Sequence, residues 1–217
     1  MTSAMEAGAD WPVWIERLAR SLDKNDDSVH LPTLDMLRAS GRWTEATQPL
    51  DAAVLVPILE AAGGPELILT RRRDDLDRHA GQVAFPGGAR DPDDRGPEGT
   101  ALREAEEEIA LPAGNVGVLG RLPRYPTVSG YLVTPVVGYI AHPVKLHAAP
   151  GEVAEIFTLP LSVLLDRSRW IRRSLDMGDR RVSMREMHWG DQRIWGVTAG
   201  MLQIMIPMLR EALEADR

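Results

Sequence analysis

The chain has 217 residues, of which 44% are hydrophobic, and carries a formal net charge of −7 at pH 7. This length is sufficient for one substantial core, and the acidic charge opposes nonspecific adhesion to nucleic acid. The sequence contains no cysteine, which excludes disulfides, thiolate metal sites and a cysteine nucleophile.

Neither a targeting segment nor a membrane-spanning segment is evident in the sequence. No early stretch combines a basic segment with an apolar core, and no apolar run approaches the length that crosses a bilayer. We therefore expect a cytoplasmic protein whose partner is a small molecule and which binds neither nucleic acid nor a membrane.

The first 50 residues are rich in aspartate and punctuated by proline. Apolar spacing predicts a short amphipathic helix over residues 11–18 and a second helix around Leu34 and Leu37. We therefore expect a helical arm in residues 1–50, packed on a main domain that comprises residues 51–217.

Strand patterns follow this arm. The apolar run over residues 52–59 predicts a buried strand, and Gly63-Gly64-Pro65 predicts a turn into a second strand over residues 67–69, so that the two form a hairpin. Residues 81–88 form a short strand pattern that ends in a Pro-Gly-Gly break. Glycine at such a break lets the backbone come close to a ligand or a metal.

Three glutamates fall on one face of the helix predicted after this break. The run reads Arg103-Glu104-Ala105-Glu106-Glu107-Glu108-Ile109. A helical step of about 100° per residue brings Glu104, Glu107 and Glu108 to one side. The opposite side is apolar and is expected to pack into a core, which would hold the carboxylates on a fixed platform.

Such a group of carboxylates is costly without a cation. Arg103 precedes Glu107 by four residues, close enough to orient it and to reduce the repulsion among the like charges. Oxygen ligands suit Mg²⁺ or Mn²⁺, so Glu104, Glu107 and Glu108 are the predicted metal ligands. The alternative is that an acidic helix face simply meets water.

Strand and helix patterns continue to the end of the chain. Strands are predicted over residues 116–122, 131–140, 152–157 and 180–189, and helices over residues 161–165 and 196–213. Pro207 should kink or interrupt the last helix. Mixed strands with a few helices predict an α+β sandwich.

The glycine break and the acidic helix together resemble the signature of a known family. Phe85-Pro86-Gly87-Gly88, a polar loop and the acidic run resemble the Nudix box, G-x5-E-x7-R-E-U-x-E-E-x-G-U, in which U is a bulky apolar residue. The resemblance implies a Nudix-type α/β/α sandwich with a mixed β-sheet and a catalytic loop and helix. It also implies hydrolysis of nucleoside diphosphates that are linked to another moiety.

The sequence departs from that signature in four places. The interval from Gly88 to Arg103 is one residue longer, and the intermediate glutamate is absent, with Asp94 nearest to its place. Ala105 is a small residue at the U position, and Ala110 replaces the last glycine. All three metal-binding carboxylates are retained.

A second motif lies just before the box. Residues 68–88 resemble the pattern of the coenzyme A pyrophosphatase branch, L-L-T-x-R-(S/A)-x3-R-x3-G-x3-F-P-G-G. Arg73 stands where a small residue is expected, and Asp77 occupies the place of the second arginine, with Arg78 beside it. The resemblance implies that the substrate-binding residues are Thr70, Arg72, Arg78, Gly81, Phe85, Gly87 and Gly88.

Similarity to the same branch continues through residues 152–153, 157–161 and 195–200, so that it spans roughly Ala53 to Leu213. Coenzyme A carries a pyrophosphate and a separate 3′-phosphate, and arginine forks match phosphate oxygens in pairs. The arginines near the first motif could therefore hold several anionic groups at once. For those at the end of the strand, the alternative is that they only keep its edge soluble.

These residues suggest hydrolysis of the P–O–P bridge by a metal-activated water. Glu104 and Glu108 would hold the principal ion, and Glu107 would help hold further ions or act as the base. Arg103 would organise the carboxylates. On coenzyme A, the resemblance implies 3′,5′-ADP and 4′-phosphopantetheine as products. Glu152 is a further candidate base, because family members often bring a glutamate from a late loop toward the metals; an exposed glutamate at a strand start is the alternative.

Two other functions stay open at this point. One is a sister Nudix pyrophosphatase that acts on ADP-ribose, a dinucleotide or an oxidised nucleotide. The other is a noncatalytic nucleotide sensor, which the retained carboxylates oppose. Met201, Met205 and Met208 recur at helical spacing and indicate either core packing or a subunit contact, so the last helix could support a homodimer.

Overall fold

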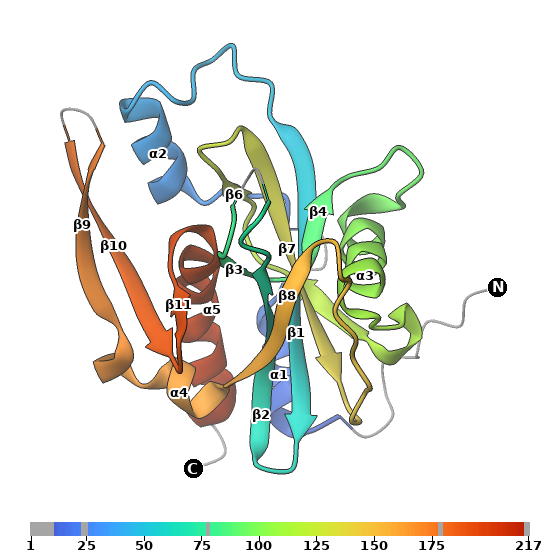
Figure 1. Ribbon diagram of the computed structural model, residues 1–217. Coiled ribbons are helices and arrows are strands. Elements are labelled where there is room, and N and C mark those ends of the chain that lie inside the picture. The colour runs from blue at the N-terminus through green and yellow to red at the C-terminus, as the bar shows by residue number, and fades with distance from the viewer. Residues whose placement is uncertain (1–10, 23–25, 77–78, 178–179, 215–217) are drawn as a thin grey trace.

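A mixed β-sheet forms the middle of the protein (Figure 1). The computed structural model describes residues 11–22, 26–76, 79–177 and 180–214. The strands of the main sheet are β1 (Leu50–Ala61), β2 (Gly64–Arg72), β3 (Val83–Ala84), β4 (Gly87–Ala89), β5 (Gly117–Arg121), β6 (Tyr125–Pro126), β7 (Tyr131–Ile140) and β8 (Val153–Pro160).

The strand pairing explains why this sheet is mixed. The order across the sheet is β3-β2-β1-β7-β5, and β4, β6 and β8 pair with β1, β7 and β2 respectively. β1 and β2 form the predicted antiparallel hairpin, whereas β1 and β7 run parallel. A parallel pair requires a crossover between its strands, and the chain makes this crossover through the helix that carries the acidic run.

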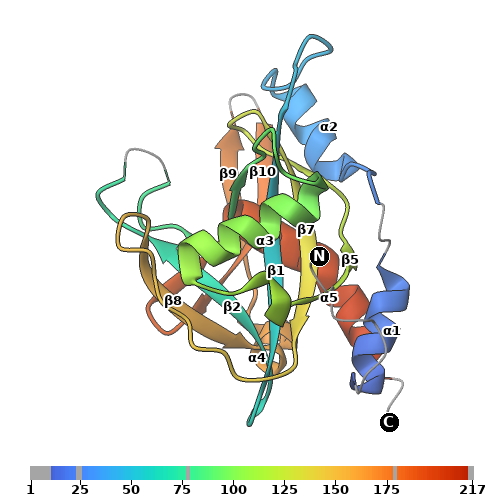
Figure 2. The same ribbon diagram turned by 90° about the vertical axis from the view of Figure 1, so that its right-hand side faces the viewer.

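Helices cover both faces of the sheet, so the protein is the predicted α/β/α sandwich (Figure 2). The helices are α1 (Val13–Ser21), α2 (Leu31–Ala39), α3 (Gly96–Ile109), α4 (Leu161–Leu165) and α5 (Gly196–Glu214), with short 3₁₀ turns η1 (Ala113–Asn115) and η2 (Arg167–Arg169). α3 lies across one face of the sheet, and α1, α4 and α5 pack on the other.

The alternation of side chains along β1 separates the two cores. Ala53 and Leu55 point to the face where Ala105 and Ile109 of α3 are buried. Val56 belongs to the other face, which packs against the helices that begin and end the chain. This two-residue period is what a strand buried on both faces requires, and it places α3 directly against the centre of the sheet.

The terminal helix differs from the sequence prediction at Pro207. α5 runs without interruption from Gly196 to Glu214 with Pro207 inside it, so of the two predicted outcomes, a kink or an interruption, the interruption is wrong. Pro207 lies on the exposed side of the helix, where water can bind the carbonyl that loses its hydrogen bond. Met201 and Met205 are buried in the core beside α1, so this face of α5 is a core face.

The N-terminal helices pack on this framework at two different places. Trp14, Ile15 and Leu18 of α1 are buried in the same apolar cluster as the residues of α5. Leu37 of α2 lies instead in a small separate cluster with Trp43. Two segments of the first 50 residues are thus tied to the sheet by burial, while the division into an arm and a domain stays a prediction.

A second, antiparallel sheet projects beside the main one and was only partly predicted (Figure 1). Its order is β11-β10-β9, and the strand pattern over residues 180–189 predicted only the middle strand. The outer strands carry too few apolar residues to give a strand pattern. The strands are β9 (Ile171–Met177), β10 (Arg180–Trp189) and β11 (Gln192–Ile194).

Candidate active site

The backbone of β4 and the acidic face of α3 meet at Gly88. β4 pairs with β1, which fixes the glycine break beside the helix. A Cβ atom added to Gly88 would lie 2.6 Å from Oε1 and 2.8 Å from Oε2 of Glu104. Only glycine therefore allows the carboxylate of Glu104 to approach the strand this closely.

Arg103 connects two of the predicted metal ligands. Its Nη1 donates to Oε1 of Glu104 at 2.9 Å and to Oε2 of Glu107 at 3.0 Å. The same guanidinium forms two parallel hydrogen bonds with Asp94, through Nε at 3.0 Å and Nη2 at 3.0 Å. Arg103 is therefore fixed from one side by Asp94 while it holds the carboxylates on the other side.

Asp94, which lies nearest to the place of the missing intermediate glutamate, pairs with Arg103. Its side chain is only 6% exposed. The hydrogen bonds from Arg103 hold the pKa of Asp94 well below its usual range, so the pair is ionic at neutral pH. A shorter aspartate thus reaches Arg103 from a loop that is one residue longer than the usual spacing.

Glu108 is the most buried of the three carboxylates, with 4% of its surface exposed. The Gly87 N–H donates to its Oε2 at 3.4 Å, and Nη1 of Arg72 lies 3.8 Å from its Oε1. Burial raises the pKa of Glu108 to about 7; the charge of Arg72 lowers it, and the charges of Glu104 and Glu152 raise it. A buried carboxylate in this setting is stabilised by any cation that reaches it.

Glu104 and Glu152 belong to the same electrostatic group. Burial raises the pKa of Glu104, Arg103 lowers it, and the charges of Glu107 and Glu152 raise it further. The loop before Glu152 is anchored on the end of α3, because the Ala149 N–H donates to the Glu108 carbonyl at 2.8 Å. The structure thus brings Glu152 near the acidic helix although it lies far away in sequence.

The three predicted ligands lie side by side and do not converge on one point. Glu107 is 60% exposed and pairs with Arg103, whereas Glu108 is turned inward toward Arg72. Across the described ranges, no group of three Asp, Glu, His or Cys side chains is arranged to hold a metal ion without adjustment. In this arrangement Arg103 partners Glu104 and Glu107, and Arg72 partners Glu108, while the metal-ligand role of the three carboxylates stays a prediction.

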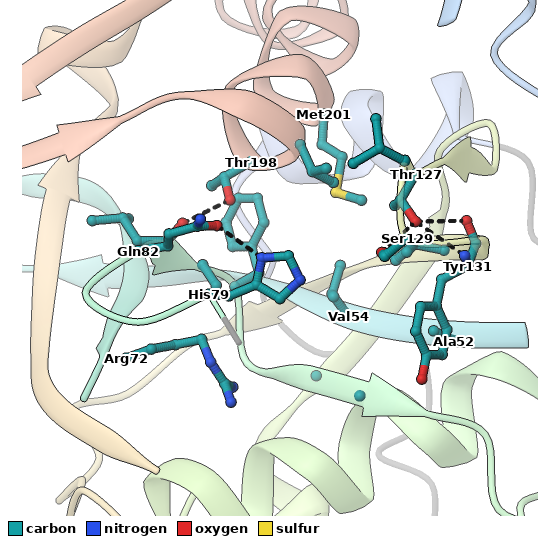
Figure 3. A pocket seen from close by; sticks show the side chains of 18 of the residues that line it. Ala52, Val54, Arg72, His79, Gln82, Thr127, Ser129, Tyr131, Thr198 and Met201 are labelled. Carbon is teal, nitrogen blue, oxygen red and sulfur yellow. Dashed lines mark hydrogen bonds between the residues drawn. The ribbon is translucent and has the colours of Figure 1, made fainter. Parts of the chain in front are cut away.

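Four of the predicted substrate-binding residues line one cavity. Arg72, Phe85, Gly87 and Gly88 form part of the wall of a cavity of about 400 Å³ (Figure 3). Arg72 lies between this cavity and α3, so the motif before the box and the acidic helix meet at this side chain. Its Nε is buried and has no hydrogen-bond partner.

The other predicted substrate-binding residues have contacts within the protein or cannot be placed. The Thr70 hydroxyl is buried and donates to the Ala84 carbonyl at 3.2 Å, which ties β2 to β3. Gly81 has a φ of +66°, and a Cβ atom there would lie 2.6 Å from Oδ1 of Asp74. Both residues shape the segment that connects Arg72, at the end of β2, to Phe85. Arg78 lies outside the described residues.

The remaining walls of the cavity were not predicted as part of a site. His79, Val128, Tyr131, Trp195 and Met201 line it and come from separate parts of the chain. The similarity noted at residues 195–200 was the one signal that could have pointed to the α5 wall. No pattern in the sequence linked the loop before β7 to this cavity.

Comparison with known proteins assigns the family. Residues 49–175 match the model of the NUDIX domain. The chain is 47% identical over 155 residues to a protein named uncharacterized Nudix hydrolase NudL from Pectobacterium atrosepticum, covering 71% of this chain and 80% of the relative. It is 44% identical over 181 residues to a protein of the same name from Yersinia pestis, covering 82% and 89%. The chain belongs to the Nudix family and is a Nudix pyrophosphohydrolase.

Solved structures give a weaker likeness. A MutT/nudix family protein from Enterococcus faecalis aligns with a TM-score of 0.48 and 16% identity, covering 83% of this chain and 74% of that structure. The Nudix hydrolase RenU from M. smegmatis aligns with a TM-score of 0.44 and 25% identity, covering 54% of this chain and 74% of that structure.

Within the described part of the chain, no helix has the length and apolar character needed to cross a membrane.

Proposed function

We propose that this chain hydrolyses the pyrophosphate bond of coenzyme A or its acyl derivatives, with 3′,5′-ADP and 4′-phosphopantetheine, or its acyl form, as products. As a Nudix hydrolase it acts on the pyrophosphate bond of a nucleotide. The coenzyme A assignment rests on one observation: Arg72, from the motif before the box, lies 3.8 Å from Glu108 of the acidic helix and also lines the adjoining cavity.

The donor atoms at the site fit a divalent cation. Glu104, Glu108 and Glu152 offer only carboxylate oxygens, which hard cations such as Mg²⁺ and Mn²⁺ prefer. Burial and mutual repulsion raise the pKa of Glu104 and of Glu108, which is the effect expected where a counter-charge would be favourable. When bound, such an ion lowers the pKa of an attacking water and offsets negative charge on the phosphate oxygens.

Different side chains of this protein would then bind the cation, bind the phosphate and act as the base. Glu104 and Glu108 would hold the cation, and the exposed Glu107 beside Arg103 would help hold a further ion. Arg72 would leave Glu108 to bind a phosphate oxygen, since its buried Nε lacks a partner and a guanidinium binds phosphate in pairs of hydrogen bonds. Glu152 is the proposed base because its charge acts on both Glu104 and Glu108.

The proposal is tested by the identity and labelling of the products. The purified chain is incubated with coenzyme A and Mg²⁺ in isotopically labelled water, and the label is located by mass spectrometry. We expect 3′,5′-ADP and 4′-phosphopantetheine, with label on one of them, and no products once the metal is chelated.

Parallel reactions at fixed Mg²⁺ compare coenzyme A with dephospho-coenzyme A and ADP-ribose. A clear preference for coenzyme A supports the proposal. Equal or better turnover of ADP-ribose would instead identify a nucleotide pyrophosphatase of another Nudix branch. If none of these compounds is hydrolysed in a metal-dependent reaction, the result would favour a noncatalytic sensor.

A further inference from the structure

The cavity beside β4 is mainly apolar on the side that faces α5. Its volume of about 400 Å³ lies within the range of about 300–1,000 Å³ typical of small-molecule sites. Its walls come from β1, the end of β2 and the segment before β3, β3, β4, β7, the loop before β7 and the start of α5. The apolar lining side chains include Val54, Val83, Phe85, Val133, Val197 and Met201.

Several polar side chains in the lining already have partners within the protein (Figure 3). The Thr198 hydroxyl donates to the Val83 carbonyl at 2.9 Å, and the Thr127 hydroxyl donates to the Tyr131 carbonyl at 3.0 Å. Nδ1 of His79 pairs with Oε1 of Gln82 at 3.1 Å. A nucleobase needs donors and acceptors fixed in the plane of its ring, whereas a flexible chain can turn its few polar groups toward water and needs mainly contact area.

The charge of the cavity is confined to one end. Among the lining residues that the structure describes, Arg72 is the single arginine or lysine, and it lies at the end next to Glu108. An additional phosphate placed deep in the cavity would therefore lose its water without gaining a cation from those walls. The half of a ligand that extends from the pyrophosphate into this cavity should therefore be uncharged.

We propose that this cavity binds the pantetheine arm of the substrate, together with any acyl chain on its sulfur, and leaves the 3′-phosphoadenosine outside. This inference rests on the proposed function. Coenzyme A joins two dissimilar halves at its pyrophosphate, and the pantetheine half is the flexible one without further charge. Met201 gives the inner wall an unbranched side chain that adapts to different chain lengths.

The inference is tested by introducing a charge at the cavity wall. Val128 lines the cavity and is 52% exposed, so Val128→Asp places a carboxylate there without disturbing the core. Val13 on α1 is 53% exposed and is not part of the lining, so Val13→Asp is the matched control. Binding of 4′-phosphopantetheine, its octanoyl thioester and adenosine 3′,5′-bisphosphate is measured by calorimetry with Mg²⁺ present.

For the wild type, we expect the octanoyl thioester to bind at least as tightly as 4′-phosphopantetheine. Val128→Asp should weaken both by about tenfold or more, because a carboxylate would replace an apolar wall contact with the uncharged arm. Adenosine 3′,5′-bisphosphate should bind the variant and the wild type equally, and Val13→Asp should match the wild type throughout.

Three results would overturn the inference. In the first, Val128→Asp weakens the binding of adenosine 3′,5′-bisphosphate alone. In the second, Val128→Asp changes the affinity for all three ligands equally. In the third, neither pantetheine compound binds the wild type. Turnover of coenzyme A is measured separately on the wild type. Its absence would overturn the proposed function, whereas the binding results would still decide what the cavity accepts.

Discussion

The two faces of the central sheet carry two different kinds of site. On the α3 face, carboxylates and arginines are fixed by ion pairs at 2.9–3.0 Å, and nearly all of them come from residues 87–108. On the α5 face, an apolar cavity is assembled from residues 52–54, 127–133 and 195–201 together with the loop around Phe85. The proposed metal ligands are therefore close together in sequence, whereas the cavity proposed to select a substrate is built from distant segments.

The largest effect on the α3 face is expected from Glu108→Gln. Glutamine keeps the size of the side chain but removes the charge that would hold a cation, so kcat for coenzyme A should fall by about 100-fold or more. The melting temperature should change little, because the substitution removes a buried charge whose pKa is already raised. Steady-state assays and thermal melts measure both.

The control for this change is Glu106→Gln, on the same helix but exposed. It should keep wild-type turnover. Near-normal activity in Glu108→Gln would show that Glu108 is not a metal ligand. It would also contradict the assignment of the catalytic site to the α3 face.

A smaller loss is expected from Gly88→Ala, which tests the contact between β4 and α3. The added methyl group would lie 2.6 Å from Oε1 of Glu104, so that carboxylate must move. We expect turnover to fall by about 10- to 100-fold, as for changes that displace a metal ligand indirectly. Gly114→Ala is the control, since a Cβ atom at Gly114 meets nothing within 4 Å. Equal activity of the two variants would contradict the tight approach at Gly88.

Asp94→Asn should have a weaker effect of about tenfold on kcat, because it loosens Arg103 without touching a proposed metal ligand. Asp93→Asn, at an exposed neighbouring position, should leave kcat unchanged. The measurement is steady-state turnover of coenzyme A over a range of Mg²⁺ concentrations, where a loosened site should require more metal. An unchanged metal requirement in Asp94→Asn would show that Arg103 does not need this anchor.

The smallest effect on turnover is expected on the α5 side, at Glu186. This carboxylate is 4% exposed and accepts hydrogen bonds from Arg193 at 2.6 Å and Arg173 at 3.0 Å. Arg193 also stacks on the ring of Trp195, 4.9 Å from its centroid, at the cavity wall. Glu186→Gln should therefore raise KM for coenzyme A by about two- to fivefold and leave kcat unchanged, because the arginine partners are about half exposed and such pairs contribute only about 1 kcal/mol. A drop in kcat with KM unchanged would contradict this separation of roles.

The same residue gives a test by pH. Burial acts to raise the pKa of Glu186, but the hydrogen bonds from Arg193 and Arg173 outweigh it, so the pKa is lowered. The stability that comes from this carboxylate is therefore present above its unfolded pKa and is lost as the pH falls through the lower folded pKa. In urea unfolding, Glu186→Gln should be less stable than the wild type near neutral pH, and the difference should shrink in acid. A difference that stays constant with pH would show that the ion pairs do not contribute.

Parts of the fold with a regular local period were predictable from sequence. The β1–β2 hairpin, α3 and the mixed sandwich follow from alternation, glycine turns and a helical apolar face. α5 was predicted, but whether Pro207 would interrupt it was left open, because the cost of the proline is reduced where its side of the helix faces water. β9 was missed because its residues give no apolar alternation and it is held by pairing with β10.

The sequence by itself determined the type of chemistry, because Glu104, Glu107 and Glu108 are neighbours within two helical turns and their spacing survives any packing of that helix. The tertiary structure decided how these charges differ: it buries Glu108 beside Arg72, leaves Glu107 exposed, and brings Asp94 to anchor Arg103. It also created the cavity, since contacts between β1, the loop before β7 and α5 depend on the sheet order. Spacing along a chain fixes only what one element can hold, whereas a cavity exists only after separate elements have packed around it.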